Sequence, residues 1–555
     1  MMKSFFPGLG RRIMVLASKK YDPTIPLNLV RSMSAETASI DRCRISDDAA
    51  WESEFRRELE KIVDVHKNDA SHQESATCLR NLLKTGLLRH TDIVDNPERF
   101  FLAHRLIAEK SVSIGPGFWI RFTVHYNLCV GTIVGLGNDE QIFELENMQR
   151  FGKLGCFSLT EKFAGVNSGF IVNTRADWNE ADQTFSINTF SEGSKKNWIS
   201  QGNVADKTVV IADLHINNKS VGPHAFIMTL RDTVGNLVPG ISCGDMGRKT
   251  VGNDLDNAWI AFDNVVVPKH ALLNKYADVE EGKYIQKKKN TPVFHMIGQR
   301  LFSGRIAVAQ AALTFRRKLF EKTRTYTDSK LCWDASDSKR ITDSAAETEY
   351  GSPLSKIPQL DALYRESEGR ALVLEQFAAQ CEKGLNETLR SHTLPSITLI
   401  EAIAVLKVKS VEDSILMCHK LRNEVGSYAL MHNSSFHQTD FLQCCKFAEG
   451  DSRILMQKMA RDRMKLYHKQ SPPPSMTSIN DWNNENTKCA LLQSNIESDC
   501  SQHGYTQLQA WNHHWEEVYD LADMTMNRIM KEFSYLTTDH KKATEKECDN
   551  YLKDF

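Results

Sequence analysis

Long segments without helix-breaking residues dominate the second half of the chain. Each is rich in Ala, Leu and Met and nearly free of Gly and Pro, which is typical of long α-helices. Several such helices in succession predict a helical bundle, because each apolar face needs a neighbouring helix to cover it. The segments are 301–321, 360–382, 396–425 and 447–467.

Polar segments interrupt and end this helical region. Residues 334–356 are polar and predict a surface loop. The Pro-rich run 471–475 predicts the start of a linker that extends to about residue 487. The remainder, with its main helix expected at 508–536, predicts a small appended helical unit.

The centre of the chain has a different pattern, which begins near Gly155. Runs rich in Val and Ile are separated by Gly and Asn turns, which favours a compact antiparallel β domain. These runs lie at 207–216, 224–230 and 258–267. Upstream, apolar residues recur at helical spacing, and the helix candidates are 51–65, 77–88 and 97–109.

The sequence therefore predicts an α+β fold. An N-terminal helical domain precedes a central antiparallel β domain, a C-terminal helical bundle and a short second helical domain. The expected parts are a flexible basic N-terminus at 1–45, followed by domains at 46–154, 155–275, 290–468 and 488–555.

Charge and cysteine usage limit the possible partners. Lys plus Arg number 69 and Asp plus Glu 70 among 555 residues, a net charge of −1. A general nucleic-acid binder would carry a basic excess, so we expect no nucleic-acid partner.

No apolar run reaches the roughly 18 residues of a transmembrane helix, so we expect no membrane span. The 13 cysteines are scattered without a CxxC pair, which favours reduced thiols inside the cell.

The N-terminal 20 residues contain Lys and Arg but no Asp or Glu. This pattern is typical of a mitochondrial presequence. An ordinary flexible basic tail explains it equally well, so the sequence leaves both interpretations open.

Most conventional motifs of catalysis and binding are absent from the sequence. Gly135-Leu-Gly137 is explained by a turn. Asp254-Leu-Asp256 resembles an incomplete cation-binding loop without the Gly and Glu that would complete it. His513 and His514 could bind a metal, but a solvated helix face is the favoured interpretation, so no metal site is predicted.

Three segments differ from the turns around them: 156–169, 196–202 and 446–451. Taken singly, each is explained by turn or helix-cap chemistry, in which Thr, Asn and Gly are common. Taken together and in order, they resemble the acyl-CoA oxidase and acyl-CoA dehydrogenase superfamily. The resemblance covers roughly residues 50–465. It includes 244–257, Gly304-Arg305, Leu421-Arg422 followed by Gly426, and 447–461.

The resemblance implies that Glu449 is the catalytic base. The family removes a proton from the carbon next to a thioester and a hydride from the following carbon. The proton is weakly acidic, so its removal needs a carboxylate and a polarised carbonyl in a dry site. FAD accepts the hydride. Without the resemblance, Glu449 would be an ordinary acidic residue at a helix N-terminus.

The resemblance also implies which residues bind FAD. Thr160 would hydrogen-bond the pyrimidine end of the flavin, Trp198 would pack against it, and Ser200 would lie near flavin N5. Arg305 would bind the diphosphate, and Gly426 would allow close approach near the adenine half. The alternatives are an edge-strand Thr, a core Trp, a surface salt bridge for Arg305 and a helix C-cap for Gly426.

The expected function is an acyl-CoA oxidase, and two alternatives remain. An oxidase passes electrons to O₂ and forms H₂O₂, whereas a dehydrogenase passes them to an electron-transfer flavoprotein. The segments 244–249 and 447–461 favour the oxidase, while Ser200 favours the dehydrogenase because its side chain narrows access to N5. A catalytically idle structural homologue is favoured by substituted cofactor positions, among them Val166, where the family usually has Ser or Thr.

For the oxidase, the resemblance implies a fatty acyl-CoA substrate, a trans-2-enoyl-CoA product and a place in fatty acid β-oxidation. It also implies a homodimer, because the family's FAD sites lie at a subunit interface. The implied compartment is the peroxisome, and the basic N-terminus keeps the mitochondrion open as an alternative.

Overall fold

The computed structural model describes residues 47–67, 69–168, 171–287, 293–332, 351–471, 473 and 478–536. The chain divides into two compact units, Met1–Phe55 and Arg56–Phe555. The N-terminus predicted at 1–45 and most of the loop predicted at 334–356 lie outside the described residues. None of the described helices is both long and apolar enough to cross a membrane.

The helices predicted in the N-terminal region are confirmed. The one predicted at 77–88 begins earlier, because Ser71 caps it and Glu74 completes a capping box. Gly86 ends it with a left-handed φ of 68°. The elements are α3 (Asp48–His66), α4 (His72–Thr85), α5 (Asp92–Asp95), α6 (Pro97–Ile114), α7 (Gly117–Thr123), η1 (Val124–Val130), α8 (Gly131–Leu136) and α9 (Asp139–Arg150).

The segment η1 is a π-helix, a wider turn that is frequent at functional sites. Val124 at its start is part of the β-domain core, and Leu128 packs against that core. One face of η1 is therefore fixed against the sheets, which leaves its remaining residues to meet the helical bundle.

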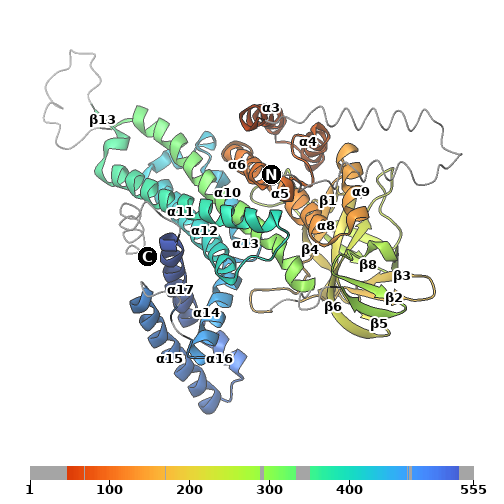
Figure 1. The fold of residues 1–555 in the computed structure, drawn as a ribbon. Coiled ribbons are helices and arrows are strands. Elements are labelled where there is room, and N and C mark those ends of the chain that lie inside the picture. The colour runs from red at the N-terminus through yellow and green to blue at the C-terminus, as the bar shows by residue number, and fades with distance from the viewer. Residues whose placement is uncertain are drawn as a thin grey trace, which may run out of the picture. The chain divides into compact units, whose positions relative to one another are not determined.

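Two sheets make up most of the β domain (Figure 1). The six-stranded sheet has the order β1-β5-β2-β3-β9, with β6 beside β5, and the three-stranded sheet has the order β4-β8-β7. Their strands are β1 (Gly155–Ser158), β2 (Arg175–Asn179), β3 (Thr184–Asn188), β4 (Lys196–Ser200), β5 (Lys207–Ile216), β6 (Lys219–Thr229), β7 (Ile241–Asp245), β8 (Asn257–Phe262) and β9 (Val265–Pro268). Shorter elements are η2 (Glu192–Ser194), η3 (Lys269–Ala271), β10 (Ala277–Glu280) and β11 (Lys283–Gln286).

The predicted strands are found, but the purely antiparallel sheet is wrong. Both β1 and β2 pair with β5 in parallel. The physical reason is connectivity: the chain makes other strands before it reaches β5, and such long crossovers permit parallel pairing. The single strand expected at 258–267 is also two strands, β8 and β9, which lie in different sheets.

The bundle helices predicted at 301–321, 360–382 and 396–425 are confirmed (Figure 1), whereas the one predicted at 447–467 is interrupted. Asp413 of α12 is completely buried and forms ion pairs with Arg316 of α10 at 2.5 Å and Arg370 of α11 at 3.1 Å. These pairs tie three helices together. The elements of this region are α10 (Val293–Ser329), β12 (Leu331–Cys332), β13 (Ser352–Pro353), η4 (Leu354–Lys356), α11 (Pro358–Arg390), α12 (Ile397–Glu424), η5 (Gly426–Leu430), η6 (His432–Ser434), η7 (Phe436–Thr439), α13 (Asp440–Phe447) and α14 (Ser452–His468).

The tail helices are α15 (Ile479–Gln502), α16 (Gln507–His513) and α17 (Trp515–Leu536). The predicted linker end at residue 487 is wrong, because α15 begins at Ile479. Buried contacts stabilise the first turns of α15. Glu485 forms buried ion pairs with Arg463 and Arg528, and the Arg463 guanidinium lies 3.7 Å from the Trp482 ring centre. The helix expected at 508–536 is likewise two helices.

Candidate active site

Glu449 lies in a break between α13 and α14. The sequence predicts one helix over 447–467 with Glu449 at its start, and this is wrong: α13 ends at Phe447 and α14 begins at Ser452. Glu449 has a left-handed φ of 56°, which costs a non-Gly residue on the order of 1–3 kcal/mol. Asp451 caps α14 by accepting from the Arg453 N–H at 2.8 Å. The break therefore holds Glu449 in a strained conformation that a helix start would not require.

The Glu449 side chain points into the protein, although the residue as a whole is only half-buried. Its Oε1 accepts a hydrogen bond from Asn127 Nδ2 of η1 at 3.3 Å. Its Oε2 is buried and has no hydrogen-bond partner among the described residues. Burial raises the pKa of Glu449 to about 7, against the opposing effects of Arg305 and Asn127. With this pKa, both the protonated and the ionised form of the carboxyl are populated near neutral pH, as proton transfer requires.

Gly304 of α10 makes room for this carboxyl. A Cβ at position 304 would lie 2.2 Å from Glu449 Cδ and 2.7 Å from Asn127 Nδ2. No side chain fits there without displacing the carboxyl. Ser303 then donates to Asn127 Oδ1 at 2.7 Å, which fixes the orientation in which Asn127 presents its amide N–H to Glu449.

Lys407 of α12 fixes the segment that carries Glu449. Its ammonium donates to the Lys446 carbonyl at 2.6 Å, the Gly450 carbonyl at 3.0 Å and Ser452 Oγ at 3.1 Å. The side chain is buried, and burial lowers the pKa of Lys407 to about 8. Three acceptors on both sides of Glu449 match the three donors of an ammonium group.

Arg305 lies against the same segment. Its Nε donates to the Glu449 carbonyl at 3.1 Å, and burial lowers the pKa of Arg305 to about 10. Gly426 directly follows Val425, the C-cap of α12, and begins η5 with a φ of 60°; a Cβ there would meet no described atom within 4 Å. A left-handed Gly is common just after the cap of a helix.

Thr160 and Trp198 meet at an exposed edge of the β domain. The Thr160 carbonyl accepts from the N–H of Asn197, the residue before Trp198, at 2.8 Å. The adjacent Glu161 and Lys196 side chains form a fully buried ion pair at 3.0 Å. The alternative of a core Trp is wrong, because Trp198 is 57% exposed. Its φ of 56° falls in the irregular part of the β4–β8 ladder, which turns the ring outward.

Ser200 follows on the same strand. Its Oγ accepts from Asn257 Nδ2 at 3.1 Å, so the hydroxyl is already oriented by the neighbouring strand β8. The loop after Thr160 reaches α14, where Gln457 donates to Asn167 Oδ1 at 2.8 Å. This bond connects the edge that carries Thr160 to the helix that follows Glu449.

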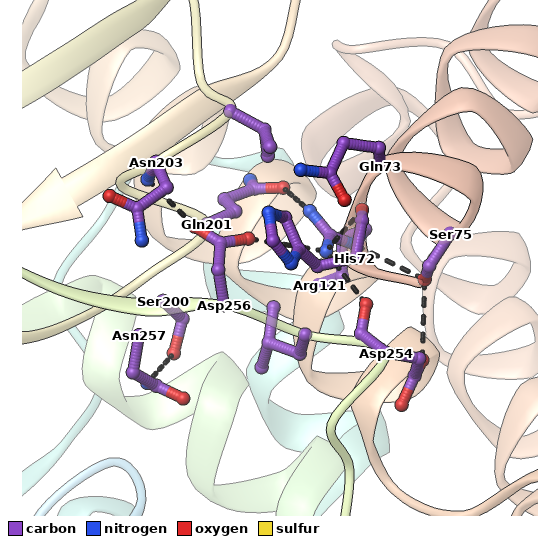
Figure 2. A network of polar contacts seen from close by, with 12 residues as sticks. His72, Gln73, Ser75, Arg121, Ser200, Gln201, Asn203, Asp254, Asp256 and Asn257 are labelled. Carbon is purple, nitrogen blue, oxygen red and sulfur yellow. Dashed lines mark hydrogen bonds and ion pairs between the residues drawn. The ribbon is translucent and has the colours of Figure 1, made fainter. Parts of the chain in front are cut away.

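A second buried cluster surrounds Arg121 of α7 (Figure 2). Arg121 and Asp256 have fully buried side chains with 3.3 Å between Nη2 and Oδ1. The guanidinium also donates to the carbonyls of His72 at 3.1 Å and Asp254 at 2.9 Å, and to Ser75 Oγ at 3.3 Å. The two Asp residues thus hold a guanidinium between α4, α7 and the segment before β8.

The Arg121 cluster continues to the end of β4. Gln201 accepts from Arg121 at 3.4 Å and donates to the Gly155 carbonyl at 2.6 Å. Asp256 Oδ2 accepts from the Asn203 N–H at 2.7 Å (Figure 2). The cluster therefore holds the turn directly after Ser200 and positions the edge that carries Trp198.

Sequence reasoning missed Asn127, Lys407 and Arg121. Lys407 and Arg121 each have a sequence signal that could have revealed them, because each is a charged residue within an apolar stretch. The roles of Asn127 and Arg121 depend on partners that are distant along the chain.

No protein-family model matches this chain. It is 36% identical over 211 residues to "Acyl-coenzyme A oxidase 3, peroxisomal" of Arabidopsis thaliana, a match that covers 37% of this chain and 30% of the relative. The chain spans about a third of the length of the curated relatives that it first matches.

Solved structures show the same fold. Acyl-CoA oxidase3 from Yarrowia lipolytica superimposes with a TM-score of 0.68 at 20% identity, over 91% of this chain and 77% of that one. Acyl-CoA oxidase-1 of Caenorhabditis elegans, complexed with FAD and ATP, gives 0.67 at 18% identity over 91% and 78%. These matches show that the chain has the fold of the solved acyl-CoA oxidases, with helical, β and helical parts in this order along the chain.

Proposed function

We propose that this chain is an FAD-dependent acyl-CoA oxidase, with Glu449 as its base. The observation that carries the proposal is the buried Glu449 carboxyl, which has one neutral donor and a pKa raised to about 7. Its Oε2 has no hydrogen-bond partner among the residues that the structure describes. Such a group removes a proton from carbon more effectively than an exposed carboxylate with an ordinary pKa. The names of the similar proteins support acyl-CoA as the substrate class.

The residues of the β-domain edge fit a flat cofactor. Trp198 offers an exposed aromatic ring, and Thr160 beside it offers an exposed hydroxyl. Bound FAD would supply the hydride acceptor that no side chain provides. Trp198 would pack against its ring, Thr160 and Ser200 would donate or accept hydrogen bonds, and Arg305 and Gly426 remain the proposed contacts to its diphosphate and adenine parts.

In the proposed reaction, Glu449 takes the proton from the carbon next to the thioester onto Oε2, the oxygen that no described residue contacts by a hydrogen bond. Lys407 and Arg305 hold the backbone on either side so that the carboxyl stays in place during this transfer. Asn127 keeps the other oxygen oriented. Exclusion of water strengthens each of these contacts.

Further parts of the proposal are the acceptor, assembly and location. We propose O₂ as acceptor, with H₂O₂ and trans-2-enoyl-CoA as products in fatty acid β-oxidation. We also propose a homodimer. We propose a peroxisomal location as well, which the names of relatives support. A dehydrogenase that uses an electron-transfer flavoprotein is the second candidate, because Ser200 Oγ is fixed by Asn257 where it would narrow access to the flavin.

The test uses purified chain reconstituted with FAD and mixed with saturated acyl-CoAs in air. The visible flavin band and H₂O₂ are followed together in the wild type and in Glu449→Gln. Continuous H₂O₂ release that the variant abolishes is the expected result. Flavin bleaching without H₂O₂ would favour the dehydrogenase. Failure to take up FAD would overturn both enzymes in favour of a structural homologue.

A further inference from the structure

Two adjacent histidines face one buried carboxylate at the far end of the tail helices. His513 Nδ1 lies 2.6 Å from Asp499 Oδ2, and His514 Nε2 lies 3.1 Å from the same atom. Asp499 is near the end of α15 and is only 7% exposed. In the described part of the chain, this is the one group of three or more His, Cys, Asp or Glu residues that brings ligand atoms within 4.8 Å of one another.

A break in the helix makes this convergence possible. Consecutive side chains on a continuous α-helix point about 100° apart, so two adjacent histidines would not reach one atom. His514 instead separates α16 from α17 with φ −89° and ψ 37°. Because of this break, both rings turn toward α15.

The His514 ring has the environment of a metal ligand. Its Nε2 is buried and has no hydrogen-bond partner of acceptable geometry among the described residues, although it faces Asp499. Its other nitrogen, Nδ1, lies 3.5 Å from Glu517 Oε1. A metal-bound histidine typically directs its second nitrogen to a carboxylate in this way.

We propose that Asp499, His513 and His514 bind a divalent transition metal of the zinc class. Two imidazole nitrogens and one carboxylate oxygen are zinc's usual ligands, and a tetrahedral site would leave its fourth position to water. Ligand atoms about 2.0–2.1 Å from zinc lie roughly 3.3 Å apart in a tetrahedron. The three ligand atoms here lie within 4.8 Å of one another, and the His514–Asp499 separation of 3.1 Å is close to that value. The ion would join the end of α15 to the junction of α16 and α17.

This inference changes the expectation for His513 and His514. The sequence favours a solvated helix face because adjacent histidines alone make a poor site. The structure adds Asp499, 14 residues upstream of His513, and Glu517 behind His514. The site is independent of Glu449 and of the proposed oxidase activity.

Zinc binding to the full chain, stripped of metal by a chelator, tests the proposal. Competition with a chromophoric zinc indicator should reveal one tight site whose affinity falls about 100-fold or more in Asp499→Asn and His514→Gln. Glu517→Gln, which removes only the outer carboxylate, should cost about 10–100-fold. The matched control is His437→Gln in the exposed pair His432 and His437, whose ring centres lie 4.4 Å apart; it should bind zinc like the wild type.

Two further measurements make the outcome decisive. Melting in the presence of chelator should be the same for wild type and variants, whereas zinc should raise the melting temperature of the wild type alone. X-ray absorption at the zinc edge should show imidazole and oxygen neighbours. Sulfur neighbours would place zinc on cysteines and overturn the proposal, as would unchanged zinc affinity in both Asp499→Asn and His514→Gln.

Discussion

Two buried charged clusters of this protein differ in how completely their groups are paired. Arg121 has an anionic partner in Asp256 and further oxygen acceptors around its guanidinium. Glu449 has one neutral donor to Oε1 and none to Oε2 among the described residues. The cations nearest to Glu449, Lys407 and Arg305, donate to backbone carbonyls rather than to its carboxylate.

This difference in pairing indicates different roles for the two clusters. When a buried charge has an opposite charge and hydrogen-bond partners, these offset its desolvation cost, and the group stays ionised. A buried carboxylate without compensation has a raised pKa, because desolvation penalises its charged form. The Arg121 cluster is therefore expected to matter for folding, and the Glu449 cluster for proton transfer.

The largest effect is expected from Glu449→Gln. Loss of the proposed base should lower kcat for the proposed acyl-CoA oxidation about 10²–10⁴-fold, whereas the free energy of unfolding at pH 7 should not fall. A neutral amide of the same shape replaces a carboxyl that is costly to ionise. The matched control is Asp92→Asn, a buried carboxyl whose pKa is raised to about 6, which should leave kcat unchanged. Equal activity of wild type and Glu449→Gln would remove Glu449 from the mechanism.

For Arg121→Met we expect the opposite result: stability falls, whereas the pH dependence of activity does not change. Asp256 would be left as an uncompensated buried charge, so the free energy of unfolding should fall by about 3–5 kcal/mol. Urea unfolding at pH 7 measures this loss. Variants of Arg121 that remain folded should keep the pH dependence of wild-type activity. A loss below about 1 kcal/mol would show that the cluster is not the stabilising junction inferred from its contacts.

A smaller effect concerns the pH dependence of stability. The folded pKa of Glu449, about 7, is above its ordinary value of 4.5, so between these values the folded state binds more protons than the unfolded state. The free energy of unfolding should therefore decrease as pH rises from 4.5 to 7, by on the order of 3 kcal/mol from this group. Comparing wild type with Glu449→Gln over this pH range isolates the contribution. Parallel curves for the two proteins would contradict the raised pKa.

The smallest effect is expected from Lys407→Met. Two backbone carbonyls lose their buried donor, which costs about 1–3 kcal/mol of stability. Because the Glu449 segment loosens, kcat should fall about tenfold while KM stays near the wild-type value. Lys407→Arg, which keeps a positive charge, should restore part of kcat. A rise in KM without a fall in kcat would mean that Lys407 contacts substrate instead of positioning Glu449.

The sequence predicts long, regular elements well because their signals are local. The strand at 207–216 is observed at Lys207–Ile216, and the helix at 396–425 is observed at Ile397–Glu424. The Glu449 break was missed because a left-handed residue between two helices has no periodic signal. Glu449 itself was found by resemblance rather than by pattern.

The environment of the site could not be predicted in the same way. Asn127 and Glu449 are 322 residues apart in the sequence, and Arg121 and Asp256 are 135 residues apart. Such pairs depend on how the helical and β parts pack, which helical or strand periodicity does not encode. The exposed position of Trp198 similarly depends on an irregularity in the β4–β8 ladder.

An infrared titration of the Glu449 carboxyl is the most direct test. The difference spectrum of wild type minus Glu449→Gln, recorded against pH, isolates the C=O band of one protonated carboxylic acid. A buried and incompletely bonded carboxyl should lose this band with a midpoint near pH 7. A midpoint at or below its ordinary value of 4.5 would show that the carboxylate is compensated, and would contradict the contrast between the two clusters.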